Sequence, residues 1–498
     1  MTVPTRAGDV LAVSYPVSLR AVDKFDPRTG VQAQVALFAL LAVYFLIWPI
    51  WRLPFGIEIA PNEAWNAYHA DAAVGGGTLY PSPDTLIVNN YPPLSFYALG
   101  YLGKILGDPL YVGRVLSLMA TVGLGALIAR VVLQLGAGGA SAAIAGLWFI
   151  AIMARSFSLY VGMDDPQLAG EFVMVAALSW FLARDQAGKS PEPPILLMVL
   201  AGFWKHNIIA VPATVLVWLW LRDGRRALRP AVMGFGAALI GLLICVAIYG
   251  DVFLANLFTP RAYRLSRALD GLGRAQWVAP ALVIWALWAW SVRRIWQARF
   301  TALYIGIATV AYLVQWIGED ILDNAQFDLV IAVAIGLGLT FDGVVPTPFA
   351  RRFGVNAARA VIVFVLVVRL LATLRIEPAM VILDPTYRAK FYTNAQVVRT
   401  DAARVAAIPG PVACDIKFVC RMAGKPFVYD DFRVDMLIET GASRGRDAEQ
   451  IIQEHGITFV RNDPRASITS LYLAIAGKYR MDRAQQDPSP HDRTQRTP

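Results

Sequence analysis

Charged residues are scarce in this chain. Asp, Glu, Lys and Arg make up 16% of its 498 residues, compared with about 25% in typical soluble domains. Hydrophobic residues make up 57%, and the mean hydropathy is +0.50. A soluble core of this size does not need so many apolar residues, so the composition excludes an ordinary soluble protein. It indicates a polytopic membrane protein.

Cysteine is scarce as well, with only Cys245, Cys414 and Cys420 in the chain. These three have neither the spacing of a zinc site nor the density of a disulfide-stabilised scaffold. Cys245 lies inside an apolar run, so only the other two could pair. The sequence leaves open whether they form a disulfide or stay as free thiols.

Signal-peptide features are missing from residues 1–30, which contain neither a compact apolar core nor a small-residue cleavage site. We expect a cytosolic tail there. The net charge of +9 does not imply a nucleic-acid partner, because excess Lys and Arg in a membrane protein usually lie in cytoplasmic loops. A polar tail, residues 483–498, is expected to be disordered.

Apolar runs long enough to cross a bilayer, roughly 17–25 residues each, recur along the chain. They lie at about residues 33–53, 110–134, 139–158, 165–183, 230–250, 277–296, 301–317, 326–342 and 358–376. No internal repeat is visible. The segment 92–108 is apolar but short and begins with two prolines, so we expect an interfacial helix there.

A further apolar region, residues 195–221, is interrupted by Lys205, His206 and Asn207. Basic residues flank it on both sides, and the positive-inside rule places both flanks in the cytoplasm. Two short spans joined by an external hairpin satisfy that rule. The total is about eleven transmembrane helices, with the N-terminus inside and the C-terminus outside.

The loop at residues 249–277 conflicts with this topology. It should be external, yet it contains Arg261, Arg264, Arg267 and Arg274. Either the topology is wrong there, or these arginines bind an anion.

From about residue 377 the composition becomes that of a soluble domain. Short strands are expected at 412–416, 426–429 and 457–461, with a helix at 447–455. We therefore divide the chain into a transmembrane domain, residues 31–376, and a small α/β domain on the outer face, residues 377–482.

Polar residues gather at the outer ends of the expected spans. These polar residues are Glu58, Asn62, Glu63 and His69 after the first span, Asp164 and Asp165 before the fourth, Lys205, His206 and Asn207 at the hairpin, and Glu319, Asp320, Asp323, Asn324 and Asp328 before the tenth. Ionisable groups are rare near membrane spans unless they face a cavity and have a function there.

Each acidic candidate also has a structural interpretation. Glu63 could be a solvated loop carboxylate or a charge at a helix N-terminus. Asp164 or Asp165 could cap a helix that begins at Pro166, which is compatible with catalysis. Glu171 lies about 10 Å deeper than Asp164 on nearly the same helix face. A carboxylate with a shifted pKa and a structural ion pair fit that position equally well.

The basic candidates have alternatives too. Lys205 could bind a phosphate or extend its amine to the headgroups, and His206 could be a structural group. Arg261 and Arg264, three residues apart, could share one helix face. Their guanidinium groups suit anionic lipid headgroups in general or one specific phosphate.

Residues 31–376 resemble a known family through the order of several short motifs. The motifs are Asn62-Glu63-Ala64-Trp65-Asn66-Ala67-Tyr68, Tyr91-Pro92-Pro93-Leu94, Arg114-Val115-Leu116-Ser117, Asp164-Asp165-Pro166, Lys205-His206-Asn207 with Pro212, and Asp323-Asn324-Ala325-Gln326-Phe327-Asp328. This order is similar to that of the membrane-embedded GT-C-fold glycosyltransferases, which include protein O-mannosyltransferases and lipid A aminoarabinose transferases.

The resemblance implies transfer of a sugar from a polyprenyl-phosphate donor to an envelope acceptor, which is a glycolipid, polysaccharide or protein, at the outer face of the cytoplasmic membrane. It implies Glu63 as general base, Asp164 or Asp165 as a second catalytic carboxylate, and Lys205 as a phosphate ligand. The other expected substrate-binding residues are Asn62, His69, Tyr91, His206, Asn207, Arg261, Arg264, Asp323 and Asn324.

The family motif usually begins with Asp-Glu, and here Asn62 replaces the first acid. Without a pair of carboxylates, a metal site in that loop is less well supported, so no cofactor is expected to be required. A divalent cation would need Asp164, Asp165, Asp320 and Asp323 to meet in space.

The chemistry is coherent without the resemblance. Displacement at an anomeric carbon needs a base for the acceptor proton and cations for the leaving phosphate. One base without a carboxylate nucleophile favours inversion.

Two other classes of function compete with the enzyme. A transporter or flippase would use ionisable groups near mid-membrane, and Glu171 with the interrupted hairpin region favours it. A structural envelope subunit would use the outer domain for contacts.

Overall fold

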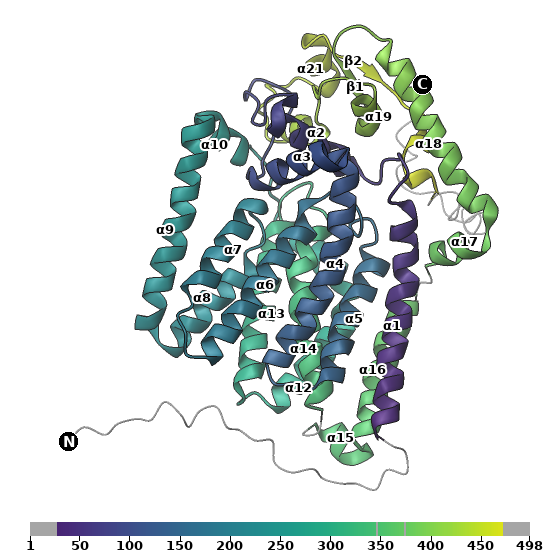
Figure 1. The fold of residues 1–498 in the computed structure, drawn as a ribbon. Coiled ribbons are helices and arrows are strands. Elements are labelled where there is room, and N and C mark those ends of the chain that lie inside the picture. Colours follow the sequence, from purple (N-terminus) through teal and green to yellow (C-terminus); the bar gives the residue numbers. More distant parts are fainter. Residues whose placement is uncertain (1–26, 345–346, 373–374, 472–498) are drawn as a thin grey trace.

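The computed structural model describes residues 27–344, 347–372 and 375–471. They form a bundle of long helices with a smaller, mixed region covering one end (Figure 1). The tail expected at 483–498, and nearly all of the tail expected at 1–30, lie outside the described residues.

Helices occupy all eleven positions where spans are expected. They are α1 (Pro27–Arg52), α4 (Pro109–Gln134), α5 (Gly139–Ser156), α6 (Pro166–Gln186), α7 (Glu192–Trp204), α8 (Ala210–Arg222), α9 (Gly224–Tyr249), α12 (Ala279–Ser291), α13 (Trp296–Trp316), α14 (Phe327–Asp342) and α16 (Val355–Leu371). Among the described residues, seven helices are long and apolar enough to cross a membrane, and α7, α8 and α12 are shorter apolar helices. The chain is a multi-pass membrane protein.

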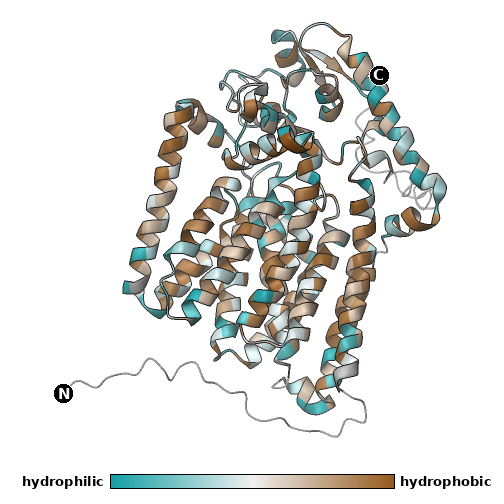
Figure 2. Ribbon diagram, viewed as in Figure 1, coloured by the Kyte–Doolittle hydropathy of each residue, from teal (hydrophilic) through white to brown (hydrophobic). Residues whose placement is uncertain are grey.

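The core of the bundle surrounds α14, in which every residue from Phe327 to Phe341 is buried. At the edge of the bundle, α9 exposes large apolar side chains such as Phe235, Leu239 and Ile248. Figure 2 shows hydrophobic residues along the bundle and hydrophilic ones at its ends and in the covering region. Apolar side chains that face outward along a helix of this length are suited to lipid.

The chain between α1 and α4, residues 53–108, is the first loop. It contains α2 (Pro61–Asp71), a π-helical turn η1 (Ala72–Gly76) and α3 (Leu94–Leu106). The 13-residue α3 corresponds to the expected interfacial helix and is too short to span a bilayer. Both helices lie across one end of the bundle (Figure 1), which we call the loop side.

Residues 377–471, the C-terminal region, cover the loop side. Its elements are α17 (Glu377–Leu383), α18 (Pro385–Ala406), β1 (Val412–Cys414), α19 (Lys417–Met422), α20 (Asp431–Glu439), α21 (Ala448–Glu454), β2 (Thr458–Val460) and η4 (Pro464–Ala466). The remaining elements are α10 (Asp251–Leu257), α11 (Arg267–Arg274), η2 (Ala275–Trp277), η3 (Asp323–Gln326) and α15 (Pro348–Phe353).

The C-terminal region contains a two-stranded parallel sheet, in which Val412 of β1 pairs with Thr458 of β2. The strand expected at 426–429 is wrong, because the structure has no strand there. The backbone N–H of Asp430 instead donates to the Leu86 carbonyl of the first loop, so this segment joins another part of the chain and not the sheet. Cys414 and Cys420 form a disulfide, which decides between the two alternatives.

Glu58 of the first loop holds the C-terminal region in place. Its backbone exchanges hydrogen bonds with the Ala466 carbonyl, at 3.1 Å, and the Ile468 N–H, at 2.8 Å. Its buried side chain accepts from the Phe418 N–H at 3.0 Å. Burial raises the pKa of this carboxyl from 4.5 to about 7, although the Phe418 N–H and Lys417 oppose the shift.

The contact at Glu58 is therefore expected to weaken as pH rises. The folded carboxyl has the higher pKa, so the folded state binds more protons between about pH 4.5 and 7, and stability falls with pH in that window. Glu58→Gln keeps the acceptor for Phe418 without a charge. Between pH 5 and 8 the wild type should lose about 2.5 kcal/mol more than the variant in the free energy of local opening.

Amide hydrogen exchange at residues 465–468, corrected for intrinsic exchange rates, measures this opening. Equal pH slopes in the two proteins would contradict the role given to Glu58.

Candidate active site

Two adjoining cavities lie on the loop side, between the ends of the bundle helices and the C-terminal region. The polar cavity has a volume of about 640 Å³ and the acidic cavity about 230 Å³. The following six residues line both, and we call them the junction: Asn62, Asn90, Tyr91, Arg261, Asp320 and Leu322. Arg261 and Asp320 are the only cation and the only carboxylate among these six.

Lys205 lines the polar cavity from the turn between α7 and α8. Its side chain is only 1% exposed, and Nζ has no hydrogen-bond partner among the described residues. Nζ lies 4.0 Å from an Asp165 oxygen and 3.6 Å from the centre of the Tyr91 ring. A buried ammonium with free N–H groups is costly unless something compensates it, so this geometry favours an anionic ligand in the cavity.

His206 and Asn207 follow Lys205 in the same turn and also line the polar cavity. Burial, with the nearby Lys205 and Arg261 charges, lowers the pKa of His206 to about 4. His206 is therefore neutral at physiological pH. Asn207 donates to the Gln315 side chain at 2.8 Å, which ties the turn to α13.

Arg261 is the one arginine of its loop that faces the cavities. It stacks 4.8 Å from the Phe432 ring centre and makes no ion pair with another described residue. The other three pair with carboxylates on the loop side: Arg264 with Glu319 and Glu439, Arg267 with Glu319, and Arg274 with Asp323.

These ion pairs explain how a basic loop lies on the same side as the C-terminal region. Three of its charges are compensated within the protein, without a bound anion. Arg264 contacts Glu319 at 3.2 Å and lines neither cavity.

Glu63 lies behind the cavities and not in their walls. It is fully buried, and its carboxylate pairs with Arg114 through two bonds of 2.6 and 2.7 Å. The same oxygens accept from the backbone N–H groups of Ile59 and Asp164. Every strong acceptor position of this carboxylate is therefore occupied, and Glu63 as general base stays a prediction.

Asp165 caps α6 by accepting from the Gln167 N–H at 2.8 Å, and Pro166 begins the helix. The expected cap is confirmed. Neighbouring Asp164 is fully buried, and its carboxylate oxygens have no hydrogen-bond partner among the described residues. Burial, and then the nearby Glu63, raise its pKa well above the usual range.

The packing around Asp164 leaves no space for a ligand on one side. A Cβ added at Gly113 would lie 1.9 Å from an Asp164 oxygen. Neither Asp164 nor Asp165 lines the two cavities.

The structure thus brings together about half of the expected site. Of the site residues expected from the sequence, those that line the polar cavity are Asn62, Tyr91, Lys205, His206, Asn207, Arg261 and Asn324. Those that line neither cavity are Glu63, Asp164, Asp165, His69, Arg264 and Asp323. Glu171 accepts from Gln167 at 3.1 Å and makes no ion pair among the described residues.

The sequence analysis gave no site role to the acids contributed by the C-terminal region. Asp430, Asp431 and Asp435 line the acidic cavity together with Lys417. Asp430 is buried, and burial raises its pKa to about 6; one of its oxygens accepts from Trp65 of α2 at 3.0 Å. The signal was the acid-rich stretch at 430–435, which also suits an ordinary helix start.

Asp320 was identified in the sequence only as a potential metal ligand. It is exposed, lines both cavities, and has a left-handed backbone φ of 54°. Aspartate tolerates this conformation better than most residues. Among the described residues, no group of three or more His, Cys, Asp or Glu side chains has an arrangement suited to a metal.

An apolar groove of about 660 Å³ runs between α6, α7, α8 and α9. Met198, Phe203 and Leu239 are among the residues that line it. His206, Leu257 and Phe258 line both this groove and the polar cavity. The groove therefore adjoins the polar cavity that Lys205 and Arg261 line.

Comparison with known proteins supports the fold. No protein-family model and no curated protein matches the chain. Two solved structures of ArnT from Cupriavidus metallidurans are similar. The apo structure has 15% sequence identity and a TM-score of 0.49, over 82% of this chain and 75% of that one. The structure bound to undecaprenyl phosphate has 13% identity and a TM-score of 0.53, over 85% and 91%. The chain therefore has an ArnT-like fold, and the resemblance to the GT-C membrane proteins is confirmed at the level of the fold.

Proposed function

We propose that this protein transfers a sugar from a polyprenyl-phosphate donor to an envelope acceptor. The observation that carries the proposal is an apolar groove that shares His206 with a polar cavity. In that cavity Lys205 Nζ has no hydrogen-bond partner among the described residues, although it lies 4.0 Å from Asp165, and Arg261 makes no ion pair with another described residue. A long apolar chain with one anionic headgroup matches that combination. The similar ArnT structure is bound to undecaprenyl phosphate, which supports the same class of lipid here.

The two cations serve the leaving group. As the bond between the anomeric carbon and the phosphate oxygen breaks, the electron pair stays on that oxygen. Lys205 and Arg261 stabilise the developing charge. Neutral His206 adds a hydrogen bond without adding charge.

We assign the general base to Asp320 and not to Glu63. The acceptor hydroxyl must lose a proton as its oxygen bonds to the anomeric carbon. Asp320 is the carboxylate of the junction, next to the cation that holds the phosphate, whereas Glu63 is bound by Arg114. A single displacement with this one base inverts the anomeric centre.

Glu63 then has a positioning role. Its pairing with Arg114 fixes the start of α2, where the preceding residue, Asn62, lines both cavities. The acidic cavity beyond the junction receives the acceptor, between α2 and the C-terminal region.

The reaction is proposed to take place at the outer face of the cytoplasmic membrane, with the N-terminus in the cytosol. Helix α15 and the adjoining ends of α8, α9 and α12 lie at the end of the bundle opposite the C-terminal region (Figure 1). These segments are rich in basic residues, as the positive-inside rule requires of the cytoplasmic side. They include Arg222, Arg225, Arg229, Arg293, Arg294, Arg351 and Arg352.

Mass spectrometry of envelope glycolipids, polysaccharides and glycoproteins, from cells with and without the gene, tests the reaction. A glycoside that disappears with the gene identifies both sugar and acceptor. Uptake of a labelled solute into vesicles, with no such glycoside, would favour the transporter.

Donor binding should depend on Lys205 and Arg261. We expect Arg261→Gln to raise the Kd for undecaprenyl phosphate about 10-fold or more, because a hydrogen bond to a charged group contributes about 1.5–3 kcal/mol. Lys205→Met should act in the same direction. Arg264→Gln is the matched control, since Arg264 already pairs with Glu319 and Glu439.

Native mass spectrometry of the protein in nanodiscs measures this Kd. Equal affinities of Arg261→Gln, Lys205→Met and the wild type would show that neither cation binds the lipid phosphate.

Asp320→Asn should abolish transfer and preserve lipid binding. Loss of a general base lowers kcat by about 100-fold or more, and asparagine keeps both the size and the backbone tolerance of this exposed position. Product formation and undecaprenyl phosphate binding are measured on the same preparation. A kcat near that of the wild type would exclude Asp320 as the base.

Glu63→Gln should lower the free energy of unfolding by about 3–5 kcal/mol, because it leaves Arg114 buried without its partner charge. The adjacent Asn62→Ala is the control and should leave thermal unfolding unchanged. A Glu63→Gln protein that is as stable as the wild type but inactive would return the role of base to Glu63.

A further inference from the structure

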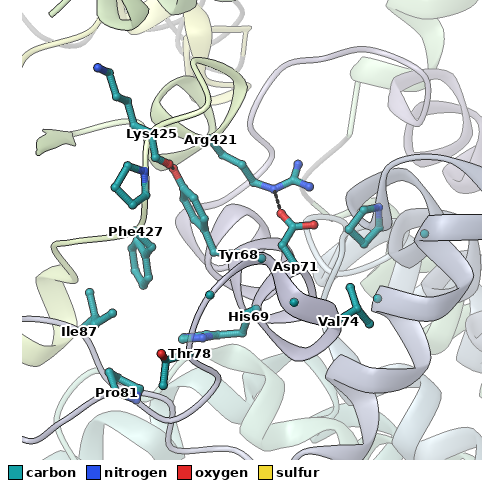
Figure 3. A pocket seen from close by; sticks show the side chains of 18 of the residues that line it. Tyr68, His69, Asp71, Val74, Thr78, Pro81, Ile87, Arg421, Lys425 and Phe427 are labelled. Carbon is teal, nitrogen blue, oxygen red and sulfur yellow. Dashed lines mark hydrogen bonds and ion pairs between the residues drawn. The ribbon is translucent and has the colours of Figure 1, made fainter. Parts of the chain in front are cut away.

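A third cavity, of about 1010 Å³, lies on the loop side between the first loop and the C-terminal region. Figure 3 shows side chains from both parts of the chain around it, with Tyr68 and His69 on one side and Lys425 and Phe427 on another. It shares no lining residue with the polar cavity, the acidic cavity or the apolar groove. Its volume is at the upper end of the range for small-molecule sites.

One turn of α2 separates this cavity from the acidic one. Trp65 lines the acidic cavity, and His69, four residues later, lines the third cavity. Their ring centres are 4.2 Å apart. The helix that Glu63 anchors therefore forms a wall between the two spaces.

His69 lines this cavity and has a buried ring nitrogen without a hydrogen-bond partner among the described residues. Its side chain is 2% exposed, and this nitrogen is Nε2. The ring bonds to the Val88 carbonyl, and burial lowers its pKa to about 3. A neutral imidazole that donates through one nitrogen accepts through the other. A buried, unsatisfied acceptor costs roughly 1–3 kcal/mol, and a ligand hydroxyl would remove that cost.

Aromatic rings provide an apolar surface beside this acceptor. Tyr68 and Phe427 stack with ring centres 4.9 Å apart at an interplanar angle of 16°. The Tyr68 hydroxyl donates to the Lys425 carbonyl at 3.1 Å, which connects the first loop to the C-terminal region. Sugar rings have an apolar C–H face, and aromatic side chains combine such a surface with a polar edge.

Glycine exposes the backbone along the rest of the wall. At Gly75, Gly107 and Gly424, an added Cβ would meet no atom within 4 Å, so the neighbouring peptide groups are accessible from the cavity. Peptide N–H and C=O groups are strong hydrogen-bonding groups. They suit a ligand with many hydroxyls.

The charge of the cavity is positive. Arg421 is compensated by Asp71 at 2.9 Å and Asp108 at 2.8 Å. Lys104 and Lys425 bond to backbone carbonyls and make no ion pair with another described residue. The Lys104 ammonium bonds to Val74, which lines the cavity, whereas the Lys425 ammonium bonds to Ile408, which does not. The uncompensated charge of Lys104 favours an anionic ligand.

We propose that this third cavity is a binding site for an anionic saccharide. The His69 imidazole accepts from a sugar hydroxyl, the Tyr68–Phe427 pair packs against a ring face, and Lys104 attracts a carboxylate or phosphate on the glycan. The identification of this saccharide as a distal part of the acceptor rests on the proposed sugar transfer. The binding itself does not.

Isothermal titration of the full-length protein in nanodiscs, without donor lipid, tests the proposal. The probes are a tetrasaccharide of alternating glucuronate and N-acetylglucosamine, and neutral maltotetraose. The anionic tetrasaccharide should bind more tightly, and its affinity should fall as salt rises. His69→Phe, which keeps a ring but removes the acceptor, should weaken binding about tenfold.

Thr78→Trp provides a second variant that does not disturb the core, because Thr78 is exposed and lines the cavity. It should block binding by filling the space. His455→Phe, the same change at an exposed histidine of the C-terminal region, is the matched control and should bind as the wild type does.

The proposal is overturned if neither probe binds, if maltotetraose binds as tightly as the anionic probe, or if His69→Phe and Thr78→Trp both retain wild-type affinity. If the protein binds the anionic saccharide but cells with the gene form no glycoside that depends on it, only the proposed function is contradicted. Transfer without saccharide binding would contradict this site alone.

Discussion

The ion pair between Glu63 and Arg114 is the interaction on which the loop side depends. Burying two charges is costly and becomes tolerable only when all donors and acceptors are satisfied. Here the remaining Arg114 donors bond to the carbonyls of Leu53, Phe55 and Ile57. The pair thereby joins the end of α1, the start of α2 and the body of α4. The orientation of α2 follows, and with it the position of every cavity on that side.

Around this anchored helix, the charged groups differ in how fully they are compensated. Glu63, Arg264 and Arg267 make close ion pairs within the protein. Lys205 Nζ has no hydrogen-bond partner among the described residues and only a 4.0 Å contact with Asp165, and Arg261 lines the polar cavity without an ion pair among those residues. The proposed donor site rests on this contrast, which residue type alone does not give.

The C-terminal region is joined to the first loop by contacts between residues that are far apart in the sequence. Asp430 accepts from Trp65 although the two residues are 365 positions apart, and Glu58 bonds to Phe418 over 360 positions. Contacts of this kind close the acidic cavity on one side and the third cavity on another. A rearrangement of this region would therefore change access to both spaces.

The sequence by itself determined the helices and their approximate ends, because a span needs a long apolar run and charges interrupt it at the membrane surface. It also determined the hairpin at Lys205 and the gathering of polar residues at one end. Which of those residues face a cavity was decided by the tertiary structure.

Asp320 and Asp323 show the difference, since they lie three residues apart and look equivalent in the sequence. Packing directs Asp323 to Arg274 and leaves Asp320 in the walls of two cavities. Glu63 was the strongest acidic candidate, yet its partner is 51 residues away. Hydrophobic periodicity is a local property of the chain, whereas the partner of a charge depends on distances between segments that only the folded structure brings together.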